Sequence, residues 1–142
     1  MNRREAMLGV AAMAGAAIAA NASAGEHDHH HGMMESALAQ ALADCIQKGQ
    51  VCLDHCLGLL GKGETEMAAC AKSVNQMLAL CTALQQLANQ QSAHVPKLAS
   101  VAMAACRDCE DACKKHADMH EACKACGESC AVCYRECKKV AA

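Results

Sequence analysis

Apolar residues recur at helical spacing along four segments of the chain, and turn signals separate these segments. A first helix is predicted over residues 34–60. It ends at a glycine-containing turn, in which Thr65 is an N-cap candidate for a second helix over residues 66–90. The only proline, Pro96, suits the first turn of a third helix, which is predicted to end near Lys115.

The last segment is predicted to form a fourth helix that ends near Val140. Asp118 and Glu121 have the spacing of a capping box, which marks its start. All connections between the predicted helices are short, so consecutive helices are expected to be antiparallel neighbours. The pattern therefore predicts an all-α protein, an antiparallel four-helix bundle that occupies residues 34–142.

The chain begins with a segment that is typical of an export signal. Two arginines, Arg3 and Arg4, precede an apolar run over residues 8–20, and small residues at 22–24 form a cleavage signature. Residues 1–24 are therefore predicted to be a twin-arginine export signal, with a bacterial periplasmic location for the protein. The apolar run is shorter than the roughly 20 residues of a membrane span, so no membrane span is expected. Residues 25–33 are interpreted as a flexible, His-rich tail.

Composition narrows the kinds of core and partner that this chain can have. It has 142 residues with 13 Cys, 9 Met and 8 His, but one Tyr and no Phe or Trp, which excludes a core centred on aromatic residues. The length supports one domain. The net charge is -2 and no block of basic residues is present, so nucleic acid is not expected as a partner.

The cysteines lie at helical spacings that place them on inward-facing stripes, one per predicted helix. At about 100° per residue, the five cysteines of the last helix fall within about 80° of one another, and the other stripes are narrower. The sequence thus predicts a bundle with a cysteine-lined lumen. The stripes consist of Cys45, Cys52 and Cys56; Cys70 and Cys81; Cys106, Cys109 and Cys113; and Cys123, Cys126, Cys130, Cys133 and Cys137.

A short, exported, cysteine-rich chain is usually a disulfide scaffold, but two features argue against that interpretation. The number of cysteines is odd, and the cysteines follow helices instead of loops. Neighbouring thiols on one helix have Cβ atoms about 5–6 Å apart, whereas a disulfide needs roughly 3.5–4.5 Å. Metal binding is therefore the favoured hypothesis.

Thiolates are soft ligands, so Cu(I), zinc and iron–sulfur clusters are the candidate occupants. Thirteen thiolates neutralised one for one by Cu(I) would leave an uncharged lumen, whereas about three tetrahedral zinc ions would leave several buried negative charges. Multiple Cu(I) ions are thus the predicted cofactor. A zinc–thiolate protein remains an alternative, as does a ferredoxin-like electron carrier, because residues 123–133 superficially resemble a ferredoxin cysteine run.

The cysteine spacings, together with Cys-Leu-Asp-His-Cys at residues 52–56 and Glu-Ala-Cys-Lys-Ala-Cys at residues 121–126, resemble the exported branch of the bacterial four-helix-bundle copper storage proteins. The resemblance covers the chain that follows the signal. It implies a lumen of Cu(I) ions held by the cysteine thiolates, no catalysis, and a homotetramer. It also implies that copper is held for exported cuproenzymes, which would be recipient partners, and that copper enters beside a His and a Met, here His55 and Met67.

Topology alone predicts a similar mouth, because the first and third connections of an up-down-up-down bundle lie at the same end. These connections bring together His55, Met67, His116, Met119 and His120. Met77 lies on the stripe of Cys70 and Cys81 and is interpreted as core packing. No charged residue occurs between Lys72 and Lys97, so the outer face of the second helix is predicted to form a subunit interface.

Overall fold

The computed structural model of this protein describes residues 28–142, and these residues form an all-helical bundle. The helices are α1 (Asp28–Leu60), α2 (Ala68–Asn89), α3 (Val95–Lys114) and α4 (Glu121–Val140), with a short 3-10 turn, η1 (Thr65–Met67), ahead of α2. The predicted all-α fold and the order of its four helices are confirmed.

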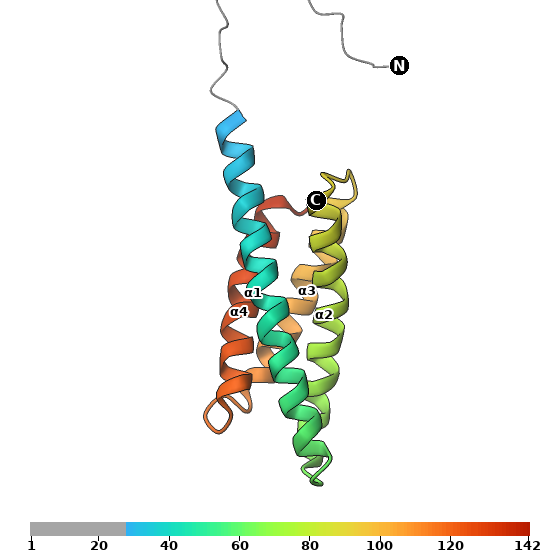
Figure 1. Ribbon diagram of the computed structural model, residues 1–142, viewed down its shortest axis with the longest axis vertical. Helices are drawn as coiled ribbons and strands as arrows, with labels where there is room; N and C mark the ends of the chain where they lie inside the picture. The colour runs from blue at the N-terminus through green and yellow to red at the C-terminus, as the bar shows by residue number, and fades with distance from the viewer. Residues whose placement is uncertain (1–27) are drawn as a thin grey trace, which may run out of the picture.

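The four helices run up and down around a common axis (Figure 1). The α1/α2 and α3/α4 connections lie at one end, and the α2/α3 turn and the C-terminus lie at the other. Each helix packs against two neighbours, α1 against α2 and α4, and α3 against α2 and α4. Within the described residues, no Cα atoms of diagonally opposed helices come within 8 Å of each other. The helices therefore enclose a central lumen that only side chains fill.

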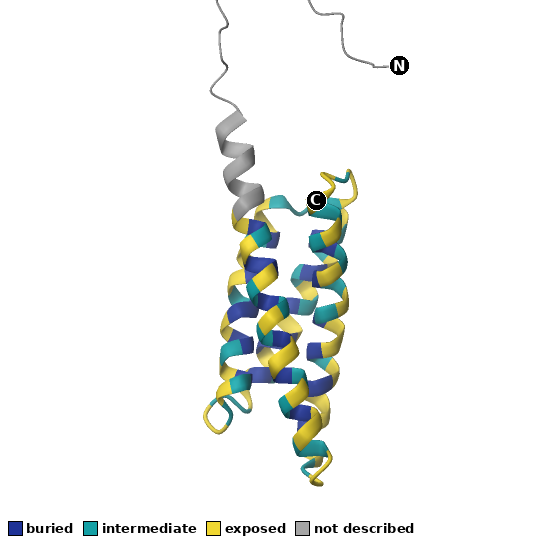
Figure 2. Ribbon diagram, viewed as in Figure 1, coloured by how far each residue is buried: buried dark blue, intermediate teal, exposed yellow. Residues whose placement is uncertain are grey.

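The interior has an apolar part and a thiol part. Near the α2/α3 turn, α1 contributes Leu38 and Leu42, α2 contributes Leu84, and α3 contributes Ala99 and Ala102, all of them buried. From there toward the opposite end, cysteines replace aliphatic residues along the inward faces of α1, α3 and α4, whereas α2 presents Val74 and Met77 between its two cysteines. Figure 2 shows this inward stripe as the buried face of each helix. The interior is thus packed with aliphatic side chains at one end and lined mainly with sulfur along the rest.

Two predicted N-caps are wrong, although the helix positions are close to those observed. Thr65 begins the η1 turn, and α2 starts only at Ala68, without a side-chain cap. Gly63, at φ 92°, closes the preceding turn by donating its N–H to the Leu60 carbonyl. His120, not Asp118, precedes α4, and it also makes no side-chain cap. In both connections tight backbone turns bring the chain directly into the next helix.

Only some of the predictions for the N-terminal segment concern residues that the structure describes. Helix α1 begins at Asp28, earlier than the predicted residue 34, so it includes residues 28–33 of the segment interpreted as a His-rich tail. The export signal predicted over residues 1–24 lies outside the described residues. Among the described helices, none is both long enough and apolar enough to cross a bilayer.

Candidate metal-binding lumen

All 13 cysteines point into the lumen, and every one is fully buried with a free thiol. They come from all four helices because each stripe repeats at three- and four-residue intervals, which keeps its members on one helix face. The predicted cysteine-lined lumen is therefore present in the structure.

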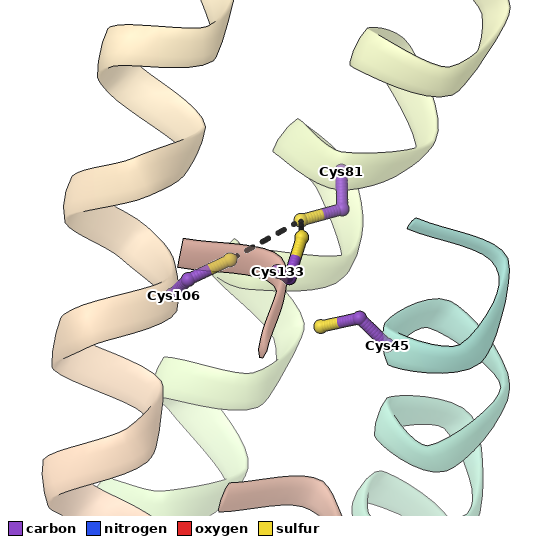
Figure 3. A group of neighbouring side chains, drawn as sticks. All are labelled: Cys45, Cys81, Cys106 and Cys133. Atoms are coloured by element: carbon purple, nitrogen blue, oxygen red, sulfur yellow. Dashed lines mark hydrogen bonds between the residues drawn. The ribbon is translucent and has the colours of Figure 1, made fainter. Parts of the chain in front are cut away.

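One group of thiols draws one cysteine from each helix, as Figure 3 shows: Cys45 from α1, Cys81 from α2, Cys106 from α3 and Cys133 from α4. Their four Sγ atoms all lie within 4.8 Å of one another. The Sγ of Cys81 is 3.6 Å from that of Cys106 and 4.0 Å from that of Cys133. The four side chains converge on a point between the helices, which is the arrangement that a bound metal ion requires.

A second group lies nearer the α1/α2 connection and contains Cys52, Cys56, Cys70 and Cys123. Within it, the Sγ of Cys52 is 3.8 Å from that of Cys123 and 4.0 Å from that of Cys56. The Sγ of Cys70 is also 3.7 Å from that of Cys113 on α3. This group therefore also joins thiols from different helices.

Two groups of three lie between these: one contains Cys52, Cys113 and Cys126, and the other Cys109, Cys126 and Cys130. Cys52 and Cys126 each belong to two groups, and we call them the shared thiols. Contacts of 3.7 Å between Cys45 and Cys130, and of 3.9 Å between Cys133 and Cys137, join the remaining sulfurs. All 13 thiols thus form one connected network along the lumen, not a set of isolated sites.

Burial and neighbouring thiols set the acidity of the lumen. Burial raises the pKa of Cys56 to about 12 and that of Cys123 to about 11, because the thiolate loses its hydration. The pKa of Cys70 is lowered, since the thiols of Cys113 and Cys52 hydrogen-bond to its thiolate. The raised pKa values keep the thiols of Cys56 and Cys123 protonated at neutral pH, so a metal must displace their protons to bind.

Close packing and side-chain contacts join α3 and α4 at one wall of the lumen. Gly127 of α4 lies so close to α3 that a Cβ atom there would come within 3.3 Å of the Cβ of Cys113. On the outside, Arg107 and Lys114 each approach the buried carboxylate of Glu110 at 2.7 Å. Arg107 also stacks on Tyr134 of α4, 4.2 Å from the ring centroid. The ion pairs stabilise α3 itself, whereas the close approach at Gly127 and the Arg107–Tyr134 contact join α3 to α4, the two helices that carry most of the thiols.

The predicted mouth is partly assembled at the end with the α1/α2 and α3/α4 connections. His55 and His120 share a hydrogen bond of 3.1 Å between Nε2 and Nδ1, and the ring of His116 lies 6.4 Å from that of His120. Met67 is fully buried directly ahead of α2, whereas Met119 is 72% exposed and faces solvent. The imidazoles thus gather beside the outermost thiols, and Met119 does not join them.

Met77 packs in the core, as the sequence predicts, and it also contacts a lumen thiol. It is fully buried, as core packing requires, but its Sδ accepts a hydrogen bond from the Sγ of Cys45 at 3.4 Å. Its place on the stripe of Cys70 and Cys81 was the available signal. Whether a buried methionine meets a thiol or an aliphatic side chain depends on the opposite helices, which a single stripe does not specify.

Fold and lumen together define the class: a helical bundle that offers soft metal ions a continuous, buried set of thiols. Residues 31–142 match the copper storage protein family. The chain therefore belongs to the copper storage protein family. No curated protein sequence gives a significant match.

Two solved structures share this fold. The copper storage protein Ccsp from Streptomyces lividans, loaded with 10 copper equivalents, is 22% identical over 86% of this chain and 92% of that one, with a TM-score of 0.70. A cytosolic copper storage protein from Streptomyces lividans with five coppers is 24% identical over 77% of this chain and 95% of that one, with a TM-score of 0.65.

These comparisons correct the predicted location. The similar protein is described as cytosolic, which contradicts export to the periplasm, so that prediction is wrong.

Proposed function

We propose that this protein stores copper as Cu(I), with many ions per chain held by the lumen thiolates and no catalytic step. The observation that carries the proposal is the connected network of 13 buried, free thiols. Thiolate is a soft ligand that favours Cu(I), and a cysteine that bridges two ions allows a chain of ions to fill the lumen. The stored ions would be released to a recipient copper protein or withheld from harmful reactions.

The geometry favours Cu(I) over the two alternatives. Separate zinc sites need four ligands of their own, whereas Cys52 and Cys126 are each shared between groups. An iron–sulfur cluster contains several ions and sulfides, yet the thiols of each group lie within 4.8 Å of one another, which leaves room for single ions. Shared, closely spaced thiolates instead suit many ions with few ligands each.

Anaerobic titration of the reduced protein with Cu(I) tests this function. We expect more than about eight Cu(I) ions per chain. This number would distinguish Cu(I) storage from zinc binding, because 13 thiols would complete only about three tetrahedral zinc sites. Proton release should accompany loading, since Cys56 and Cys123 are protonated at neutral pH. Saturation at two or three metal ions per chain, or isolation of the protein with an iron–sulfur chromophore, would contradict storage of Cu(I).

We further propose that His55 and Met67 guide copper into the lumen but do not store it. His55 lies at the mouth beside His120, and Met67 is buried next to α2 at the same end. Replacing both, His55→Ala with Met67→Ala, should slow loading and removal of copper while leaving the final capacity nearly unchanged. Stopped-flow loading and a capacity titration measure the two quantities separately. If the number of Cu(I) ions bound at saturation falls in proportion to the two deleted ligands, His55 and Met67 are storage ligands instead.

We also propose that the bundle assembles into a homotetramer through the outer face of α2. Between Lys72 and Lys97 this face exposes only uncharged residues, among them Asn75, Gln76 and Gln86. Interface cores are depleted of charge, so such a face suits a protein–protein contact. The oligomer would then depend on residues that lie outside the lumen.

Introducing charge on this face should weaken assembly. The double change Gln76→Lys and Gln86→Lys is expected to lower the mass measured by light scattering and to leave copper capacity unaltered. The matched control is Gln40→Lys with Gln50→Lys, which adds the same charges to exposed positions of α1. If both variants keep the wild-type mass, α2 is not the interface.

A further inference from the structure

Helix α2 contributes fewer thiols to the lumen than any other helix. Its two cysteines, Cys70 and Cys81, belong to the groups at either end of the thiol network. The two middle groups contain cysteines of α1, α3 and α4 only. Between its cysteines, α2 turns Val74 and Met77 inward, both fully buried. Met77 is therefore the one sulfur that α2 presents between Cys70 and Cys81.

The thioether of Met77 lies at the same spacing as the thiols around it. Its Sδ is 3.4 Å from the Sγ of Cys45, and the Sγ of Cys45 is in turn 3.7 Å from that of Cys130. These three sulfurs come from three helices, α2, α1 and α4, and Cys45 links the other two. The Sγ of Cys45 thus contacts both a neutral thioether and a second thiol.

The facing helix makes room for this methionine with a glycine. A Cβ atom at Gly49 of α1 would lie 2.7 Å from the methyl carbon of Met77 and 2.9 Å from Cδ2 of Leu78. Glycine inside a helix costs about 1 kcal/mol relative to alanine, so its presence in the middle of α1 needs a reason. Here it allows the Met77 methyl group to lie against α1 while the adjacent sulfur contacts Cys45.

We propose that Met77 is a copper ligand and that Cys45, Met77 and Cys130 form a Cu(I) site of two thiolates and one thioether. This site rests on the proposed storage of Cu(I). On binding, Cys45 and Cys130 each give up the thiol proton and Met77 donates a neutral lone pair. A thioether is a soft ligand suited to Cu(I). Because it adds no charge, the site carries one negative charge, whereas three thiolates would leave two in the buried lumen.

The first test removes the thioether at nearly constant volume. Met77→Leu should lower the affinity for one copper equivalent by about tenfold or more in competition with a Cu(I) chelator, because losing even an outer group that supports a metal ligand costs about 10–100-fold in affinity. Met103→Leu is the control, because Met103 is a partly buried methionine of α3 that packs on the outside of the core. The control should retain copper as the wild type does.

The second test observes the methionine directly in the wild-type protein. With ¹³C-methyl methionine, the Met77 signal should shift on Cu(I) loading while the Met103 signal stays in place. The Met77 signal is the one missing from Met77→Leu. Its contact with Gly49 also assigns it through a nuclear Overhauser effect to the glycine α protons, so the measurement stands even if that variant does not fold.

The third test moves the thioether without removing it. Gly49→Ala forces the Met77 methyl group away from α1 and should weaken the same copper equivalent. Gly58→Ala is the matched control, because a Cβ atom there meets nothing within 4 Å and the gain in helix propensity is the same. The control is expected to retain the wild-type affinity.

The outcomes separate this site from the storage function. A wild-type protein that fails to take up many Cu(I) ions contradicts storage itself, whatever the methionine does. The proposed site is overturned if the wild-type protein loads fully but its Met77 signal does not move, and if Met77→Leu and Gly49→Ala retain copper like their controls. Met77 would then serve only in packing.

Discussion

Copper-free, reduced protein is expected to show the far-ultraviolet circular dichroism of an intact helical bundle, and copper is expected to raise its thermal midpoint by at least about 20 °C without changing that spectrum. The aliphatic end supports the bundle without metal, through Leu38, Leu42 and Leu84. Protonated cysteines also pack as small hydrophobic side chains. Copper should therefore stabilise a fold that already exists.

The size of the shift follows from the number of ions. When the free copper concentration is about a thousand times the dissociation constant of a site, the ion bound there adds about 4 kcal/mol to the free energy of unfolding. For a domain of this size, about 1 kcal/mol raises the midpoint by a few degrees. Thermal scans of anaerobic samples with and without copper measure it, and a sample with copper held by excess chelator is the control. A random-coil spectrum before loading would indicate a metallothionein-like chain that folds only around metal.

The sequence predicted the helices because two independent signals agree along the chain. The cysteine and leucine periodicity marks the inward faces, and residues such as Gly63 and Pro96 mark the turns. The N-caps were wrong because side-chain capping competes with turns closed by the backbone alone, as before α2 and α4. Which of the two closes a connection depends on the angle between the helices, which periodicity does not encode.

The stripes of thiols were predictable, but their partners across the lumen were not. That Cys52 and Cys56 share a face follows from one helix. That Cys52 also meets Cys123, Cys113 and Cys126 depends on the axial shift and rotation of three other helices. The same reason explains Met77, whose partner on α1 becomes visible only when Gly49 is placed opposite.

The predicted location rested on residues 1–24, and comparison with a cytosolic protein of the same fold corrects it.

Loss of the shared thiols is expected to reduce copper capacity more than loss of the same number of other cysteines. Cys52 and Cys126 together belong to three of the four thiol groups, and the group that contains both would keep only Cys113. Cys56 belongs to one group, and Cys137 contacts the network only through Cys133. If bridging thiolates hold several ions each, removing the bridges should release ions from all three groups.

Two double variants are compared. The first replaces the shared thiols, Cys52→Ser with Cys126→Ser, and the second replaces two other thiols, Cys56→Ser with Cys137→Ser. All four positions are fully buried, so each pair introduces two buried hydroxyl groups and a similar cost of roughly 1–3 kcal/mol per unpaired group. Anaerobic Cu(I) titration against a competing chelator should show about twice the loss of bound copper for the first pair. If the two pairs lose the same amount, each cysteine contributes independently, and the lumen acts as a set of separate sites instead of a bridged cluster.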